Sequence, residues 1–574
     1  MKDKDMKKLA NKVGDQIKKQ TQSKIFKGAM IAGAAIAAAV GVFVVVRAVR
    51  KRRSLLEGRD PKNLTRAKNI YISGNTLASY AAAAYLVSEG GYPGKSIHIY
   101  GVPAASAVTE EYGSIGSVSR ALMEAIDARS DDDFDVETVL ENASFSAAPK
   151  VRVMSADGSA RDLCIKPDKA MLKAMARAFR KLVSSDDASQ VSVAQCLEGA
   201  EGFFDSDLYA FLEMTFGIRE DSRATELLSR VIALTSSASK AGLYDTLYYD
   251  FSTFSAIENY LEENGVDILR GAQITGIDAS ENKVSAIHAM NEGTRMTIYL
   301  NREDYVILDT GSIGDGASEG SYNSAAEMLD SVPASMSLWQ DAAAKDDSFG
   351  LPEMLLEDNA EYVEFSIVDD DGYLLKKLCD KALVVPDNGV SILIPESNWK
   401  MKLTSEPYSL VPDAAMNEAL ETTADEGEED VPEQAVSAIT NAPQPVITVK
   451  GVFTGSEGNY VEKTMRECTG IELLYELICH MGLADEWDEI AKKIKTVMVN
   501  VLPFKNAPLR TAPTYALPEL LPCDNCAMTG DFVRTNAPAA TIEQQIQSGR
   551  NAAYAVLGKK AKKAKTKMPE LKRL

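Results

Sequence analysis

The residues best suited to chemistry form a glycine-led turn near residue 74. Asn69–Ser73 reads as a short β-branched strand, and Gly74 leads from it into an alanine-rich helix over Leu77–Glu89. In a βαβ unit such a turn can hold a pyrophosphate, because N–H groups at the helix N-terminus point at the phosphates and glycine lets the backbone approach them. The turn therefore predicts a dinucleotide site with these cofactor contacts: Gly74, Asn75, Thr76, Leu77, Ala78 and Ser79.

The signature of this turn is incomplete. The pattern G-x-G-x-x-G/A maps to Gly74, Thr76 and Ser79, so only its first glycine is present. Thr76 adds a Cβ where a pyrophosphate would press against the backbone. Gly101 follows the second strand, where an acid usually binds the ribose. The segment supports the fold more strongly than it supports the cofactor.

Two later turns are of the kind that brings a Rossmann-like chain back to a flavin. Tyr305–Ser312 carries a buried strand into a Thr-Gly-Ser turn, and Ala527–Thr529 is a strand that leads into Gly-Asp and then a helix over Thr541–Leu557. A hydrophobic strand that ends in such a turn is also common outside flavin folds. The cofactor contacts expected from these turns are Thr310, Gly311, Ser312, Gly530, Asp531 and Phe532.

Histidine and cysteine contribute little recognisable chemistry. The three histidines lie on predicted strands or a helix face, and the seven cysteines, an odd number without dense spacing, suit a reducing compartment. Cys523 and Cys526 form a lone CxxC, for which a structural role is expected rather than a metal or redox role. No metal site is predicted.

Charge is distributed unevenly along the 574 residues. The net charge is −21, yet residues 1–59 hold 15 Lys/Arg against 4 acids and residues 559–574 hold 8 against 1. The remaining body is strongly acidic, which argues against nucleic-acid binding, whereas two basic ends suit an anionic membrane surface.

A membrane anchor is predicted at Gly28–Val46, which is 19 residues without a charge. The basic cluster that begins at Arg47 flanks it as a cytoplasmic flank would, so we expect a single-pass protein of the cell membrane with its large domain in the cytoplasm. A buried hairpin helix is the alternative. Gly33, Ala37 and Gly41 form a small-residue stripe on which two such helices could pack as a homodimer.

Composition divides the chain into five parts. Residues 1–54 form the basic N-terminus and anchor, and residues 65–411 form a Rossmann-like FAD-binding core with inserted substrate-domain elements. Residues 412–444 are an acidic insertion, in which Pro412–Glu433 holds nine acids and no base. Residues 445–558 close the flavin or lipid pocket, and residues 559–574 are a basic tail.

Within these parts, several secondary-structure elements are expected. A hairpin over Lys150–Ile165 turns at Asp157-Gly158, and a helix over Ala256–Asn264 ends at Gly265. A run of short strands follows that helix. A strand over Val446–Phe453 and a helix over Gly470–Gly482 are expected near the C-terminal end.

The segment Gly451–Leu483 resembles the oleate hydratase family, also called myosin-cross-reactive antigens. It contains Gly-Asn-Tyr-Val, then Thr-Gly-Ile-Glu-Leu, then Glu-Leu-Ile-Cys-His-Met-Gly. The opening βαβ and three further stretches are similar to the family in order and spacing, so the resemblance covers most of Lys68–Leu557; these stretches are Asp304–Ser321, Ser337–Leu355 and Met528–Leu557.

The resemblance implies an α/β composite fold: a Rossmann-like FAD-binding flavoprotein with an intertwined substrate domain and a C-terminal helical part, here preceded by one transmembrane helix. It implies FAD as cofactor and a fatty acid or membrane lipid as partner. The family activity is that of a hydro-lyase: FAD-requiring addition of water to a cis double bond of an unsaturated fatty acid. Such a reaction needs an acid that protonates the alkene and a base that activates water.

This chain departs from the family at the expected catalytic and substrate residues. The family's glycine-rich loops with an acidic catalytic residue are not recognisable after Gly101, where Glu110 and Glu111 are the only nearby acids and a solvated loop is the simpler interpretation. The family's carboxylate-associated stretch aligns with Lys402, Thr404 and Tyr408. Lys402 could pair with a carboxylate, but an exposed strand lysine is the simpler interpretation.

Three functions therefore stay open. The first is hydration of a fatty acid or a related lipid. The second is a catalytically degenerate relative that binds lipid or acts as a scaffold at the membrane. The third is another FAD-dependent oxidoreductase.

Overall fold

A computed structural model of the chain describes residues 68–74, 76–101, 110–112, 117–127, 151–185, 188–236, 246–248, 251–280, 282–327, 333–355, 362–370, 372–385, 389–405, 446–511, 517–539, 541–558, 568–569 and 571. The predicted anchor and the acidic insertion lie outside these residues, as does nearly all of the basic tail. Within the described part of the chain, no helix is both long and apolar enough to span a bilayer.

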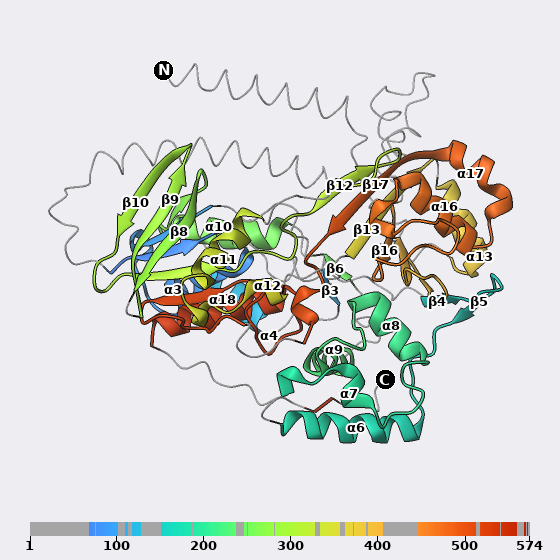
Figure 1. Cartoon of the computed structure of the whole chain (residues 1–574), viewed down its shortest axis with the longest axis horizontal. Coiled ribbons are helices and arrows are strands. Elements are labelled where there is room, and N and C mark those ends of the chain that lie inside the picture. The colour runs from blue at the N-terminus through green and yellow to red at the C-terminus, as the bar shows by residue number, and fades with distance from the viewer. Residues whose placement is uncertain are drawn as a thin grey trace, which may run out of the picture.

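Two sheets organise the molecule, one at each end of its long axis (Figure 1). The first sheet has five parallel strands in the order β18-β11-β1-β2-β7. Its strands, listed in that spatial order, are Cys526–Thr529, Tyr305–Asp309, Ile70–Ser73, Ile97–Tyr100 and Asp267–Leu269. The predicted opening βαβ is confirmed, because β1 and β2 are parallel neighbours joined by α3 (Leu77–Ser88).

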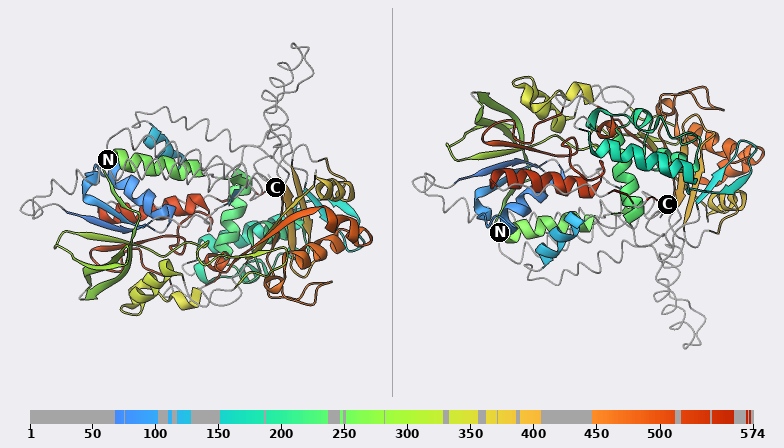
Figure 2. Two further views of the ribbon diagram at one scale, coloured as in Figure 1. Left: turned by 90° about the horizontal axis from the view of Figure 1, so that it is seen from above. Right: turned by 90° about the horizontal axis from the view of Figure 1, so that it is seen from below.

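Helices cover one face of the parallel sheet. α10 (Phe251–Glu263), α3 and α18 (Ile542–Val556) lie side by side, as Figure 2 shows in green, blue and red. α4 (Ser117–Asp127) packs against all three. Gly549 of α18 allows this arrangement: a Cβ there would lie 2.2 Å from the Ala78 carbonyl oxygen of α3, so the two helices approach at backbone distance.

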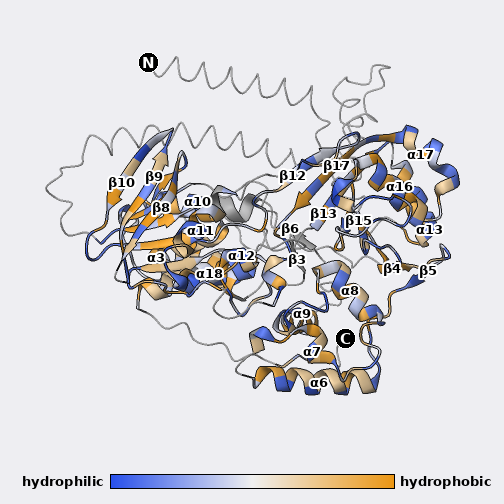
Figure 3. Cartoon of the chain, in the orientation of Figure 1, coloured by the Kyte–Doolittle hydropathy of each residue, from blue (hydrophilic) through white to orange (hydrophobic). Residues whose placement is uncertain are grey.

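The other face of the parallel sheet packs against an antiparallel three-stranded sheet and α11 (Ala334–Ala343). The three strands are β8 (Ala272–Ser280), β9 (Lys283–Asn291) and β10 (Thr294–Tyr299), which confirms the run of short strands expected there. β8 and β9 are largely hydrophobic, whereas α17 (Trp487–Lys493) at the opposite end is largely hydrophilic (Figure 3).

The second large sheet has eight strands in the order β12-β17-β13-β16-β15-β14-β4-β5. All neighbours are antiparallel except β14 and β4. The strands, again in spatial order, are Ser318–Ser321, Ile494–Leu502, Tyr362–Asp369, Val446–Gly451, Met401–Ser405, Val390–Ile394, Val151–Met154 and Ala160–Asp162. The last two confirm the hairpin predicted over Lys150–Ile165.

Helices also pack on this second sheet. α13 (Tyr373–Ala382) and α16 (Gly470–His480) share its main hydrophobic core. A separate helical layer, whose core includes β4 and β14, consists of α6 (Lys169–Val183), α7 (Val193–Leu197), α8 (Asp207–Phe216) and α9 (Ala224–Ser236). Three short elements remain to be named in the described part of the chain: the paired strands β3 and β6 (Glu110–Tyr112 and Thr246–Tyr248) and α12 (Pro352–Leu355).

Candidate functional site

The glycine-led turn is bonded to the end of a neighbouring strand. Thr76 caps α3 by accepting the Ala78 N–H at 3.1 Å, and its hydroxyl donates to Asp309 Oδ2 at 2.6 Å. The Ser79 hydroxyl lies 2.6 Å from the same carboxylate oxygen and 2.5 Å from the Ser73 carbonyl oxygen. The two residues that replace signature glycines are therefore both side-chain partners of Asp309.

Asp309 ends β11 and is fully buried. Its Oδ1 accepts the Gly311 N–H at 3.0 Å, and its own N–H donates to the Ser73 hydroxyl at 2.6 Å. Burial raises the pKa of Asp309 to about 6, against hydrogen bonds from Ser79, Thr76 and Gly311 that lower it. The carboxylate is therefore mostly charged at neutral pH.

This arrangement does not fit the pyrophosphate of a dinucleotide. A phosphate group held here needs free N–H groups and no neighbouring negative charge. The N–H groups of Gly74, Ala78 and Ser79 already donate to acceptors within the chain, and a buried carboxylate faces the turn. Packing within the sheet is enough to explain why residue 74 is glycine, since a Cβ there would lie 2.6 Å from Ile99 Cγ2. Asn75 lies outside the described residues.

The two later turns do lie together, as the sequence predicts. Thr310 donates its N–H to the Thr529 carbonyl at 2.9 Å, and the Phe532 N–H donates to the Thr310 hydroxyl at 3.3 Å. Gly530 has φ +111°, and a Cβ there would lie 2.4 Å from both Asp309 Oδ1 and Thr310 Oγ1. Only glycine fits this position. That these turns bind a cofactor stays a prediction.

Asp531 adds a second buried acid. Its Oδ2 accepts the Ile313 N–H at 2.9 Å, whereas its Oδ1 is buried and has no hydrogen-bond partner among the described residues. Burial, together with the nearby Asp309 and Asp315, raises the pKa of Asp531 to about 7. Three acids, Asp309, Asp315 and Asp531, therefore gather at the ends of β11 and β18.

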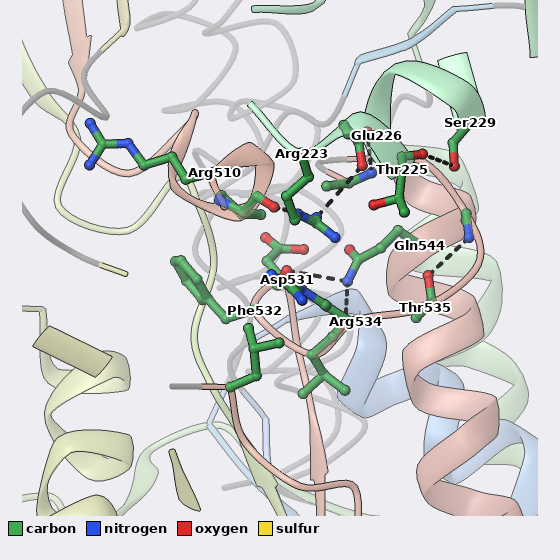
Figure 4. Close-up of a pocket in the computed structure, with 15 residues that line it drawn as sticks. Arg223, Thr225, Glu226, Ser229, Arg510, Asp531, Phe532, Arg534, Thr535 and Gln544 are labelled. Carbon is green, nitrogen blue, oxygen red and sulfur yellow. Dashed lines mark hydrogen bonds and ion pairs between the residues drawn. The ribbon is translucent and has the colours of Figure 1, made fainter. Parts of the chain in front are cut away.

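A basic pocket lies beside Asp531, and the sequence analysis missed it. It lies between the start of α9, residues 508–510 and the loop that follows β18 (Figure 4). We call it the arginine pocket; its charged lining residues are Arg223, Glu226, Arg510, Asp531 and Arg534. A local signal for it was available: Arg223, Glu226 and Arg230 have the i, i+3 and i, i+4 spacing of helical ion pairs.

The interpretation of Lys402 as an exposed strand lysine is wrong. Lys402 is 4% exposed, because β15 lies inside the eight-stranded sheet, where Lys402 is opposite Lys450 of β16. Burial lowers the pKa of Lys402 to about 7. Lys450 Nζ lies 3.7 Å from Glu364 Oε2 of β13. Thr404 is opposite Thr448, and Tyr408 lies outside the described residues.

The backbone of Glu110 and Glu111 forms β3 rather than a loop. In β3 these residues are opposite Tyr248 and Leu247 of β6. Figure 1 shows β3 and β6 in the middle of the molecule, between the two large sheets. The candidate acids are therefore on a strand at the junction of the two halves.

Several other motif residues are structural. Cys523 and Cys526 are buried, and burial raises the pKa of both thiols. The described residues contain no His, Cys, Asp or Glu group able to hold a metal ion. Glu476, from the Glu-Leu-Ile-Cys-His motif, accepts the N–H groups of Asn459, Tyr460 and Val461 at 2.6 to 2.9 Å, so it fixes the Gly-Asn-Tyr-Val turn.

Comparisons with known proteins agree with these motifs. The model of the MCRA family matches residues 121–420 and 428–554. An oleate hydratase of Streptococcus pyogenes is 24% identical over 532 residues, which is 85% of each chain. A linoleate hydratase of Lactiplantibacillus plantarum is 22% identical over 564 residues, which is 86% of this chain and 94% of the relative.

Solved structures give weaker likenesses. An oxidoreductase from Methanosarcina mazei superposes with a TM-score of 0.44 at 10% identity, over 84% of this chain and 99% of that one. A putrescine oxidase bound to putrescine also gives 0.44 at 10% identity, over 86% and 99%. Similarities this weak give no information about the function of this chain.

Proposed function

Because the chain belongs to the MCRA family, the oleate hydratase family that its sequence resembles, we propose that it adds water to a cis double bond of an unsaturated fatty acid. The main support for this proposal is the length over which the chain matches known hydratases. Each of the two hydratase relatives is matched over at least 85% of this chain, so the likeness is not limited to one nucleotide-binding unit.

The proposed reaction needs an acid and a base but no net electron transfer. The alkene π bond breaks as one carbon takes a proton from an acid. The other carbon forms a bond to the oxygen of water, whose proton goes to a base. Glu110 and Glu111 are our candidates for these roles, because β3 lies between the two halves of the molecule (Figure 1).

The family resemblance implies FAD, but the hydrogen bonds that Thr76 and Ser79 make to Asp309 do not suit its pyrophosphate. Hydration leaves the substrate at the same oxidation level overall, so its atoms and electrons balance without a redox group.

A second candidate function follows from the same contact. The buried Asp309 carboxylate at the phosphate turn favours a catalytically inactive relative that binds a fatty acid or membrane lipid. In either case we propose a single-pass protein of the cell membrane, anchored by Gly28–Val46 with its body in the cytoplasm. The basic termini would then lie on the anionic lipid surface, and the small-residue stripe of the anchor would support a homodimer.

The test separates the two candidates. The full chain is purified in detergent and incubated with oleate, with and without added FAD, and the lipids are analysed by mass spectrometry. Hydration predicts a hydroxy fatty acid that is lost in the variant Glu110→Gln or Glu111→Gln and retained in Glu263→Gln, a control at an exposed glutamate of α10. Oleate that binds but is recovered unchanged would support the inactive relative instead.

A further inference from the structure

The arginine pocket concentrates positive charge in a protein whose net charge is −21. Its residues come from three distant segments, which are the start of α9, residues 508–510 and the loop after β18. Figure 4 shows Arg223 directly above Asp531 and Gln544, whereas the Arg510 side chain extends away from the other labelled residues. Arg223 and Arg534 are therefore the relevant cations.

Arg223 is held rigidly. It is 7% exposed, and its guanidinium donates to the Pro508 carbonyl oxygen and lies 3.7 Å from Glu226. Its buried Nε has no hydrogen-bond acceptor among the described residues. The cation is thus fixed in position with one donor unused, and buried donors of this kind are normally satisfied.

Two acids, Glu226 and Asp531, line the pocket beside these two arginines, and neither neutralises them fully. Burial raises the pKa of Asp531 to about 7, so its carboxyl group is only partly charged at neutral pH. Glu226 is already shared, because it accepts the Ala539 N–H at 2.8 Å and lies 3.3 Å from Arg230 Nε. Arg534 is half-buried and has no hydrogen bond or ion pair to any part of the chain that the structure describes. Burial and the neighbouring Arg223 lower the pKa of Arg534 to about 9, whereas Glu226 raises it.

Apolar side chains line the pocket next to these cations. Leu517, Phe532 and Val533 contribute to its wall, and the Phe532 ring lies 5.4 Å from the Trp339 ring, centroid to centroid. Such a wall suits the methylene groups next to an acidic head group. Guanidinium groups bind carboxylates in a planar, bidentate geometry, which makes a carboxylate the chemical match.

We propose that the arginine pocket binds the carboxylate of the fatty acid, with Arg534 as its direct contact and Arg223 held behind it. The inference rests on the proposed function, because it takes the fatty acid as the ligand. It places the carboxylate beside Arg534, whereas the family resemblance implies a position near Lys402. Lys402 and Lys450 already have partners within the fold, whereas Arg534 has no hydrogen bond among the described residues and only the electrostatic influence of Glu226, an acid shared with Arg223 and Arg230.

The test measures binding of oleate and of oleyl alcohol to the full chain in detergent by isothermal titration calorimetry. Arg534→Gln should weaken oleate binding by about tenfold or more, the effect of losing one charge-assisted contact, and leave oleyl alcohol binding unchanged. Arg534→Lys should retain part of the affinity. Arg295→Gln, at an exposed arginine of β10, is the matched control, and circular dichroism verifies that each variant is folded.

The outcomes separate the inference from the proposed function. Equal oleate affinity in wild type and Arg534→Gln would overturn the inference and leave the proposed function standing. A loss of oleate affinity in Lys402→Gln alone would overturn it in the same way. If the wild type binds no oleate, the proposed function and the inference both fail.

Discussion

The hydroxyl of Thr76 donates a hydrogen bond to the carboxylate of Asp309 over 2.6 Å, and thereby joins the first turn of the parallel sheet to the end of β11. In a dinucleotide-binding protein this is the space that a phosphate approaches. Here an acid of the chain itself takes the hydrogen bonds. The contact explains how the βαβ unit is kept while its ligand-facing residues have changed.

Removing this contact should create affinity for FAD. The wild type is expected to show no stoichiometric flavin absorbance after incubation with FAD. Thr76→Gly combined with Asp309→Ala removes both the Cβ and the negative charge, so it should bind FAD measurably more tightly, as followed by flavin fluorescence. Asp524→Ala, at an exposed acid, is the control. A stoichiometric flavin band in the wild type would show that the turn tolerates a pyrophosphate after all.

Asp309 should also give stability a specific pH dependence. Its pKa is raised by burial from 3.8 to about 6, so the folded state binds more protons than the unfolded state between these values. The contribution of Asp309 to stability is therefore fully present below about pH 4 and is lost as the pH rises through about 6. Asp531 and Asp369, whose pKa values burial also raises, act in the same direction.

Asp309→Asn isolates the contribution of this one residue. Relative to the wild type, the variant should lose less stability between pH 4 and pH 7, by up to about 3 kcal/mol for a shift of roughly two pKa units. Urea denaturation at each pH measures the difference. Parallel stability curves for wild type and variant would mean that Asp309 is not buried as described.

The contact between α3 and α18 should not tolerate a methyl group. In Gly549→Ala the new Cβ would lie 2.2 Å from the Ala78 carbonyl oxygen, and α18 would have to move. We expect a loss of about 1–3 kcal/mol, despite alanine's better helix propensity. Gly199→Ala, where a Cβ meets nothing within 4 Å, should be near neutral. Thermal unfolding of both variants tests the difference, and equal melting temperatures would refute the close approach.

Glu476 should matter for stability rather than for chemistry. Glu476→Ala leaves three N–H groups of the Asn459–Val461 turn without their acceptor, so we expect a loss of at least about 2 kcal/mol. Glu486→Ala removes only a partly exposed ion pair with Lys377 and should cost much less, because solvent screens such a pair. A large effect of Glu476→Ala on product formation by correctly folded protein would instead assign the residue a catalytic role.

Local parts of the fold could be predicted from the sequence, because their determinants are neighbours along the chain. The strand, turn and helix around Gly74 follow from hydrophobic pattern and turn residues, as does the hairpin at Asp157-Gly158. Boundaries were less accurate: α10 begins at Phe251, five residues before the expected start at Ala256.

The long-range contacts could not be predicted. Thr76 and Asp309 are 233 positions apart, and the arginine pocket draws on three distant segments. The burial of Lys402 depends on β16, whose pairing with β15 no local pattern reveals. These contacts determine what the candidate site can bind, which is why the sequence indicated the family better than the ligand.

The proposed hydration is tested most directly by incubating oleate with the full chain in detergent, in water enriched in ¹⁸O, and analysing the lipid products by mass spectrometry. We expect a hydroxy fatty acid that has gained one water and carries the heavy oxygen on its acyl chain, formed without added FAD. Recovery of unchanged oleate by protein that binds it, with and without FAD, would contradict the proposed hydration.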